Sequence, residues 1–198
     1  MEDGAMFDTP QEEINEMLVS MGPLTIGDDS LTIQNYPFEP SIAYQQAIFR
    51  AAEIEDIDIK SSPPTIKINN ELIFLDAGKK DELQKFATTN NIKTVERPPI
   101  WAWILEPFLD TEFTAETDRR LTKLLAEYSL TTDQVKMLRE EVKTQMLKYN
   151  FDTMIWEWVS LGTLDVLKAM RPKYDKEQFN DFYQRVMKIA LLSKTTGK

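Results

Sequence analysis

The second half of the chain carries apolar residues at helical spacing. Three stripes recur every three or four residues, which is the spacing of a helix that buries one face. They consist of Leu121, Leu124, Leu125 and Tyr128; of Val135, Leu138, Val142, Met146 and Tyr149; and of Phe179, Phe182, Tyr183, Val186 and Ile189. The first stripe follows Thr114, and capping pairs precede the other two, at Thr131 with Gln134 and at Asp175 with Gln178. We therefore predict three amphipathic helices with defined starts.

A fourth helical segment, from about Asp152 to Met170, is apolar almost all round. Its interior charges, Glu157, Asp165 and Lys168, fall within an arc of about 80° when residues are placed 100° apart. Such a pattern is typical of a helix that is surrounded by other helices. Gly162 leaves a second interpretation open, in which one helix ends near this residue and another begins after it.

Together the four segments predict an antiparallel bundle over residues 108–193, because short connections favour antiparallel neighbours. The segment from Asp152 to Met170 should be its most buried member. Within that segment we expect Trp156 and Leu164 to be nearly inaccessible to solvent.

The first half mixes alternating segments with short helices. Apolar and polar residues alternate on both sides of two turn-like sequences, which predicts two β-hairpins. The first would pair residues 24–26 with 31–33, and the second 65–68 with 71–75 across Asn69-Asn70, with a further strand at Ile92 to Val95. Helices are expected from Thr9, as a cap, to Gly22, from about Ser41 to Glu55, and near Lys80 to Thr89.

We predict an α+β fold with two parts. A small N-terminal lobe of hairpins and short helices, residues 1–99, is joined to a mostly antiparallel C-terminal helical bundle, residues 100–198. The boundary lies at Pro98-Pro99, where the secondary-structure pattern changes, and residues 100–109 would be an apolar junction. A single compact domain is the alternative that the pattern leaves open.

The composition limits the catalytic and metal-binding chemistry that the protein could perform, because the 198 residues include neither Cys nor His. Without Cys there are no disulfides, thiolate metal sites or cysteine nucleophiles. Without His the commonest general base and most zinc and iron sites are lost. Catalysis would have to use Asp, Glu, Lys, Tyr, Ser or Thr, with or without a hard cation such as Mg²⁺. We predict no cofactor.

The formal charge of −10 comes from 33 acidic and 23 basic residues, and it falls in the first half of the chain. Residues 1–99 carry 18 acids and 8 bases, whereas residues 100–198 carry 15 of each. An acidic lobe of this kind would steer and orient a protein partner with a basic surface. Direct binding of nucleic acid is not expected, because the pI is about 4.7 and a glycine-rich phosphate loop is missing.

Membrane insertion is not expected either. No apolar run approaches the roughly 20 residues that span a bilayer, and residues 1–4 are acidic where a secretory signal needs positive charge. The default expectation is a cytoplasmic protein. The sequence does not indicate its oligomeric state.

The densest run of carboxylates supplies the first candidate partner-binding residues: Glu53, Glu55, Asp56 and Asp58. If the run is a free docking surface, neutralising all four should leave the melting temperature almost unchanged and slow association. The alternatives are a solvated surface, carboxylates paired with Lys60 and Lys67, or a cation site. The run lacks the alternation and the turn glycine of a calcium loop.

The other candidates are Trp101 and Trp103, in a segment from Pro98 to Leu109 that is rich in apolar residues and contains three prolines. Trp is the commonest hot-spot residue of protein interfaces, so the segment could anchor a partner. The favoured interpretation is an apolar junction that packs the lobe onto the bundle, since a contiguous apolar surface is costly to expose.

Two functions follow. The first, which we favour, is a non-catalytic protein–protein interaction or assembly protein whose acidic N-terminal lobe engages a basic partner surface. This class includes an inhibitor that mimics nucleic acid and an accessory protein of a phage or mobile element, the last without support from any residue. The alternative is a carboxylate-based enzyme, with or without Mg²⁺, acting on a small polar substrate at the lobe junction. Its best carboxylates would be Glu106 and Glu157, which have apolar neighbours, although an ordinary amphipathic placement explains both.

Overall fold

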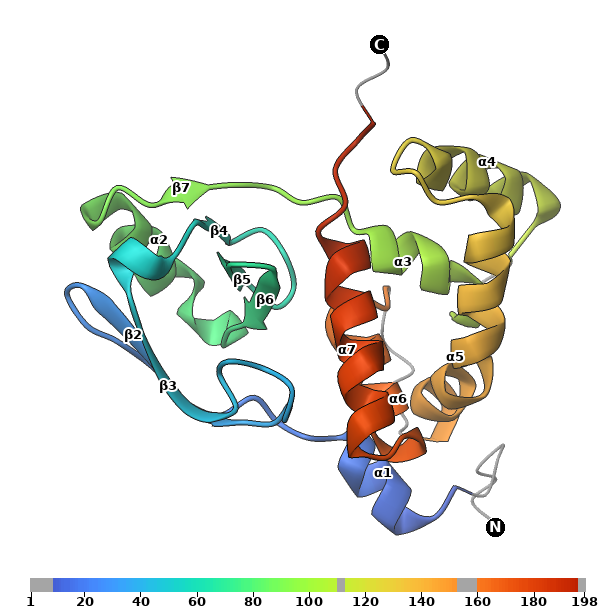
Figure 1. Cartoon of the computed structure of the whole chain (residues 1–198), viewed down its shortest axis with the longest axis horizontal. Coiled ribbons are helices and arrows are strands. Elements are labelled where there is room, and N and C mark those ends of the chain that lie inside the picture. The colour runs from blue at the N-terminus through green and yellow to red at the C-terminus, as the bar shows by residue number, and fades with distance from the viewer. Residues whose placement is uncertain (1–8, 110–112, 153–159, 196–198) are drawn as a thin grey trace. The chain divides into compact units, whose positions relative to one another are not determined.

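The computed structural model describes residues 9–109, 113–152 and 160–195, which form helices and strands of an α+β protein (Figure 1). The α-helices of the described residues are α1 Gln11–Met17, α2 Lys80–Thr89, α3 Ile100–Leu105, α4 Ala115–Ala126, α5 Thr132–Asp152, α6 Thr163–Met170 and α7 Lys176–Ala190. The strands are β1 Leu24–Ile26, β2 Ser30–Tyr36, β3 Gln45–Arg50, β4 Asp56–Asp58, β5 Thr65–Ile68, β6 Glu71–Phe74 and β7 Lys93–Thr94. Short 3₁₀ helices are η1 Ala51–Glu53, η2 Ala77–Lys79, η3 Glu106–Phe108 and η4 Arg171–Lys173. The predicted α+β class is confirmed.

The chain divides into two compact units, each assembled from separate stretches of sequence. The helical unit comprises the described parts of residues 1–18, 99–179 and 192–198. The sheet unit comprises residues 19–98 and 180–191. A division of the chain after residue 99 would group α1 with the strands and all of α7 with the other helices. In the structure, α1 belongs to the helical unit and most of α7 belongs to the sheet unit.

The sheet unit contains an antiparallel sheet in the order β1-β2-β3. The first predicted hairpin is confirmed, with Leu24 opposite Ile33 and Ile26 opposite Leu31. Gly22 precedes β1 and lies directly against β2, since a Cβ atom at this position would be 1.6 Å from the Gln34 carbonyl oxygen. Only glycine allows this close approach of two backbones.

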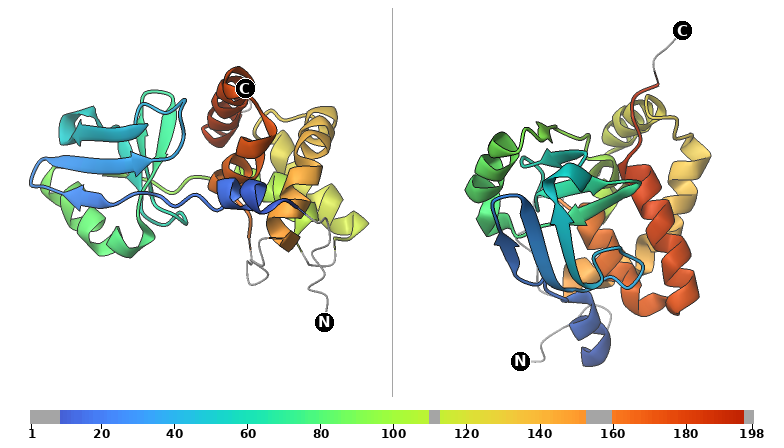
Figure 2. Two further views of the ribbon diagram at one scale, coloured as in Figure 1. Left: turned by 90° about the horizontal axis from the view of Figure 1, so that it is seen from below. Right: turned by 60° about the vertical axis from the view of Figure 1, so that its left-hand side comes forward.

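A second sheet of the same unit has the order β6-β5-β4-β7, in which β4 and β7 are parallel. The predicted hairpin across Asn69-Asn70 is confirmed, and Asn69 has the positive φ of 54° that its turn requires. The helix predicted near Lys80 to Thr89 is α2, which lies beside these strands (Figure 2) and buries Leu83 and Phe86.

The predicted helix from Ser41 to Glu55 is wrong. Residues 45–50 form β3 instead, which pairs with β2 from Gln46 opposite Gln34 to Arg50 opposite Ser30. Gln45 has a φ of 62°, which a right-handed helix does not allow. The helix propensity of Ala and Gln in this segment is outweighed by pairing with a strand that is distant in sequence.

The second half of α7 completes the core of the sheet unit. The ring of Phe38 is central, with its centroid 6.0 Å from that of Tyr183 and 6.5 Å from that of Phe74. The Tyr183 hydroxyl donates a 2.6 Å hydrogen bond to Oε1 of the buried Glu71 in β6. The core therefore joins residues that are more than 100 positions apart in the chain.

The three amphipathic helices are confirmed, α4 and α5 in the helical unit and α7 mostly in the sheet unit, together with the side chains that start them. The Thr114 hydroxyl accepts a bond from the backbone of α4. Thr131 and Gln134 exchange reciprocal bonds of 3.2 and 2.8 Å before α5. Asp175 and Gln178 exchange bonds of 2.9 and 3.3 Å before α7. Each pair satisfies N–H groups that a helix start leaves open.

The most buried side chains of this unit come mainly from α3, α5 and α6. Side chains at most 1% exposed are Ile100, Trp101, Ile104, Leu105, Leu125, Val142, Met146, Val166, Leu167, Ala169 and Met170, with Met17 from α1.

The prediction of one continuous helix from Asp152 to Met170 is wrong, because residues 160–162 are not helical. α6 begins after Gly162, as the second interpretation held. Leu164 is half-buried rather than inaccessible, while Trp156 and Glu157 lie outside the described residues.

Two polar residues form bonds that the sequence pattern did not predict. Asp165 is 8% exposed, and its carboxylate accepts bonds from the Gly162 N–H at 2.7 Å and the Tyr149 hydroxyl at 3.0 Å. Thr9 does not cap α1, since its hydroxyl donates to the buried Asp152 carboxylate. Both side chains therefore bind a residue of α5, Tyr149 for Asp165 and Asp152 for Thr9.

Within the residues that the structure describes, no helix is both long enough and apolar enough to cross a membrane.

Candidate interaction surface

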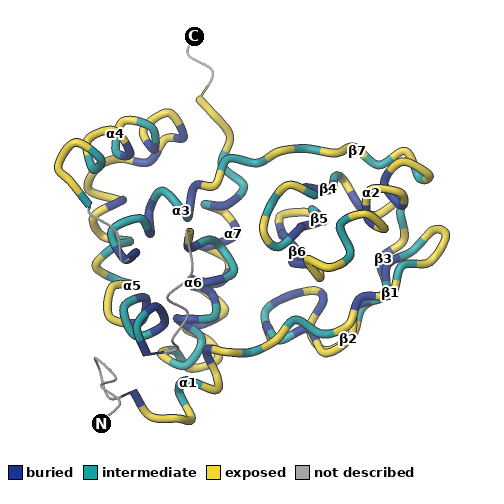
Figure 3. The backbone as a smooth tube through the Cα atoms, turned by 180° about the vertical axis from the view of Figure 1, so that it is seen from behind, coloured by how far each residue is buried: buried dark blue, intermediate teal, exposed yellow. Residues whose placement is uncertain are grey.

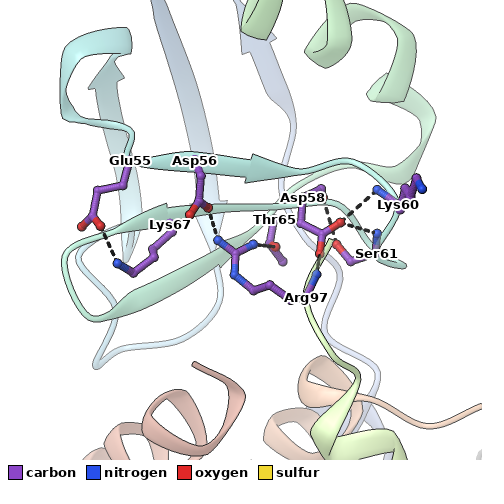
Figure 4. A network of polar contacts seen from close by, with 8 residues as sticks. All are labelled: Glu55, Asp56, Asp58, Lys60, Ser61, Thr65, Lys67 and Arg97. Carbon is purple, nitrogen blue, oxygen red and sulfur yellow. Dashed lines mark hydrogen bonds and ion pairs between the residues drawn. The ribbon is translucent and has the colours of Figure 1, made fainter. Parts of the chain in front are cut away.

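The acidic run extends from η1 into β4, and the structure provides every one of its carboxylates with an intramolecular partner. Figure 4 shows Glu55, Asp56 and Asp58 with the groups that surround them. Those groups come from β5, from the loop after β4 and from Arg97. The run is therefore an ordered network rather than a row of free charges.

Asp58 is the most constrained member, since it is 1% exposed. Its Oδ1 accepts bonds from the backbone N–H groups of Lys60 and Ser61 at 3.1 and 3.0 Å. Its Oδ2 accepts one from the backbone N–H of Arg97 at 2.8 Å. These three hydrogen bonds offset the free-energy cost of burying the charge. The Asp58 carboxylate therefore holds the loop after β4 and the segment that follows β7 in place.

Asp56 and Glu55 each pair with a cation. The Arg97 guanidinium forms an ion pair with Asp56, with side chains 14% and 17% exposed, and also lies 3.5 Å from the Thr65 hydroxyl. The Lys67 ammonium pairs with the more exposed Glu55, and its hydrogen bond holds the pKa of Glu55 below the ordinary value. Because β4 and β5 are neighbours with Asp56 opposite Lys67, the register of the sheet brings these charges together.

Glu53 is exposed, as Glu55 is, but it forms no ion pair with another described residue. Its Oε2 accepts a bond from the backbone N–H of Arg50 at 2.7 Å. It is therefore an exposed member of the run whose charge is not neutralised by a cation of the described residues.

Pairing with Lys60 and Lys67 was the structural alternative for this run. Lys67 does pair with Glu55, whereas the Lys60 ammonium lies 2.7 Å from Glu96 and only its backbone N–H binds Asp58. The expectation that neutralising all four acids leaves stability unchanged does not fit this geometry, because Asp58 is buried and bonded three times. Among described residues, no group of three or more acidic side chains is placed to hold a metal ion.

Trp101 and Trp103 are both in α3 of the helical unit. Trp101 is 1% exposed and belongs to the core of that unit. Trp103 is half-buried, with its ring centroid 5.6 Å from that of Tyr128. Glu106 is half-buried at the start of η3, and Glu157 lies outside the described residues.

Exposed apolar residues that the sequence pattern did not predict lie on β3 and in the turn before it. Ile42, Tyr44 and Ile48 are 50%, 38% and 62% exposed, and we call these three residues the edge surface. These residues were not predicted to be exposed together because the segment from about Ser41 to Glu55 was expected to be a helix. One signal was available: Ile48 and Phe49 are neighbours, so on a strand they must point to opposite faces, and a sheet covered on one face can bury only one of them.

β3 is the outer strand of its sheet, and its outward backbone groups are partly occupied. In an antiparallel pair of strands, the backbone groups of successive residues point alternately toward and away from the partner strand. The bond from Ala51 N–H to the Asp29 carbonyl shows that the backbone groups of residues 46, 48 and 50 are the ones that point away from β2. The N–H of Gln46 binds the Tyr44 carbonyl at 2.8 Å, and that of Arg50 binds Glu53. The N–H and carbonyl of Ile48 point to this outer edge, between the occupied N–H groups of Gln46 and Arg50.

Exposed carboxylates lie at one end of the same sheet. The same Ala51–Asp29 bond places η1, which contains Glu53, beside the turn between β1 and β2. That turn contains the exposed Asp28 and Asp29 and is drawn in yellow in Figure 3. We call Asp28, Asp29 and Glu53 the acidic end of the sheet.

Comparison of the chain with protein-family models, with curated proteins and with solved structures finds no match.

Proposed function

We propose that the chain is a non-catalytic protein–protein interaction or assembly protein whose sheet unit engages a partner with a basic surface. The observation that carries the proposal is the edge surface. Three of the five large apolar side chains that are exposed among the described residues lie within seven residues of one another there. Exposed apolar side chains on and beside an outer strand are costly to hydrate and are typical of interfaces.

The arrangement of charge supports a basic partner. Interfaces commonly combine apolar anchors with a polar rim. Here the edge surface supplies the anchors, and the acidic end supplies carboxylates at the end of the same sheet. Long-range attraction to Lys and Arg on a partner would raise the association rate, while burial of Ile48 and Tyr44 would slow dissociation.

The residues nominated from the sequence take unequal parts in this proposal. Glu53 would contact the partner directly, with Glu55 near it and already paired to Lys67. Asp56 and Asp58 would support the surface by fixing β4. Trp103, which is half-buried, is kept as a second contact candidate, and Trp101 as a core residue that supports it. The division into an acidic lobe and an antiparallel bundle, and a cytoplasmic location, remain parts of the same proposal.

The test is affinity capture with matched variants of the full chain. Ile48→Thr keeps the β-branched shape that a strand prefers, so the fold should persist while the apolar anchor is lost. Combined with Tyr44→Ser, it should abolish stoichiometric capture of a basic protein. Met137→Gln is the matched control, since Met137 is 64% exposed on α5 of the helical unit, and this variant should capture the partner as wild type does.

A second arm separates charge from apolar contact. Glu53→Gln with Asp29→Asn should slow association and flatten its dependence on salt, with little change in melting temperature. Capture that is unchanged by both sets of variants would refute the proposed surface. Turnover of a small substrate by the purified chain would support the carboxylate enzyme instead.

A further inference from the structure

The helical unit contains a pocket of about 440 Å³ between η3, α4 and α5. Its apolar walls come from Pro107, Phe108, Phe113, Val135 and Leu147. This volume is within the range of small-molecule sites, which are mostly apolar with a few polar groups that orient the ligand. Its residues take no part in the proposed interaction surface.

One face of α5 gives the pocket its charge. Lys136, Arg139 and Lys143 all line it, and their spacing of three and four residues places them on the same side of the helix. They occupy successive turns, so the positive charge extends over about 10 Å along the helix axis.

Arg139 forms a fixed, neutralised part of the wall. Its Nη1 lies 2.7 Å from Asp118 Oδ1, and its Nε donates to the Ile104 carbonyl at 3.0 Å. Its guanidinium carbon also lies 5.5 Å from the centre of the Phe113 ring. These contacts hold the arginine and Phe113 together as a flat, rigid surface.

The two lysines are differently placed. Lys136 and Lys143 are exposed, and neither forms an ion pair with another described residue. Glu140 also lines the pocket, so the charges that remain after the Arg139–Asp118 pair sum to one positive charge. An apolar pocket with a net charge of about one at its rim matches a ligand with an apolar body and a single negative charge.

We propose that this pocket binds a small aromatic monoanion, with its ring against Phe113 and the Arg139 guanidinium and its carboxylate or sulfonate near Lys136 and Lys143. The ring would displace water from apolar walls. The anionic group would remain near the rim, where the lysine ammonium groups can reach it without full desolvation.

The probe for the test is 1-anilinonaphthalene-8-sulfonate, whose fluorescence rises when its rings leave water, titrated into the folded full chain. Lys136→Gln with Lys143→Gln should weaken its affinity roughly fivefold and reduce the salt dependence of binding. Lys123→Gln, an exposed lysine of α4 that does not line the pocket, is the matched control and should not weaken it. The neutral analogue N-phenyl-1-naphthylamine should bind more weakly than the sulfonate and show no dependence on the two lysines.

Location is tested by amide chemical shifts, because the same dye can bind exposed apolar side chains elsewhere. The proposal expects shifts in Phe113 and in Val135 to Leu147, with residues 42–48 unaffected, and loss of binding in Leu147→Glu. Equal affinity for the sulfonate and its neutral analogue would overturn the charge assignment. Dye shifts confined to residues 42–48, or unchanged affinity in the double lysine variant, would overturn the site.

Discussion

At the scale of single residues, the buried carboxylates of this chain are held by donors from its own fold. Asp58 binds three backbone N–H groups, and Asp165 binds one N–H and a tyrosine hydroxyl. Glu71 binds the Tyr183 hydroxyl and the Ile42 N–H. Such bonds offset the cost of desolvating the charge. These three carboxylates therefore organise loops and helix starts, and they are unsuited to receive a ligand without losing those bonds.

Replacing Asp58 by Asn should be strongly destabilising. The amide keeps one acceptor oxygen but turns an NH₂ group toward backbone donors, which leaves at least one buried N–H without an acceptor. The free energy of unfolding should fall by about 2–3 kcal/mol in urea denaturation. Asp29→Asn at the exposed turn is the matched control and should cost less than about 0.5 kcal/mol. Equal effects of the two variants would contradict the role given to Asp58.

Asp165 provides a prediction about pH. Burial raises its pKa above the ordinary value of about 3.9, so the folded chain retains a proton that the unfolded chain releases. Its contribution to stability therefore falls as pH rises from about 4 through the folded pKa. Asp165→Asn does not titrate, so its stability relative to wild type should improve over that window. Urea denaturation at intervals from pH 4 to 8 measures this difference, and a difference that is independent of pH would rule out the raised pKa.

At the scale of elements, what could be predicted from the sequence is what short segments encode. The pairs Thr131 with Gln134 and Asp175 with Gln178 are three residues apart, and Asn69 supplies the turn of its own hairpin. Each contact lies within one turn of chain, so residue type and spacing are enough to specify it.

What could not be predicted depends on distant partners. β3 forms because β2 is beside it, and Thr9 binds Asp152, 143 residues away, instead of capping α1. The candidate surface was lost for the same reason, since Ile48 is exposed only when its segment is a strand with one covered face. The helix or strand propensity of a short segment does not indicate which distant segment it will pair with.

The bond between α7 and β6 gives a prediction at this scale. Tyr183→Phe removes the hydroxyl that donates to Glu71 and leaves a buried carboxylate with one donor fewer. Burial raises the pKa of Tyr183, so the hydroxyl is a proton donor throughout the physiological range. The variant should lose about 2 kcal/mol of unfolding free energy. Tyr44→Phe, at an exposed tyrosine, should lose almost none, and similar losses in both would show that the Tyr183 bond is unimportant.

At the scale of the whole molecule, the charge asymmetry changes when charges are counted by unit rather than by half. Residues 19–98 carry 12 acids and 8 bases, and residues 180–191 carry one acid and two bases, so the sheet unit has a net charge of only −3. Three further acids and no base lie in residues 9–18, which fall in the other unit, and the three acids of residues 1–8 lie outside the described residues. The proposed recognition by the sheet unit would therefore depend on the local acidic end and the edge surface, and little on the total charge.

The division into units also predicts which amides should be protected together. Residues 180–191 are adjacent in sequence to the helical unit, yet their side chains complete the core around Phe38. In native-state hydrogen exchange, the amides of Tyr183 to Ala190 should therefore open with the same free energy as those of β5 and β6. Asp58→Asn, which weakens the sheet unit, should lower the protection of both sets by similar amounts and leave α5 and α6 nearly unchanged. If the amides of α7 instead follow those of α5 and α6, the second half of this helix does not belong to the folding unit of the sheets, and the Tyr183–Glu71 bond is an incidental contact.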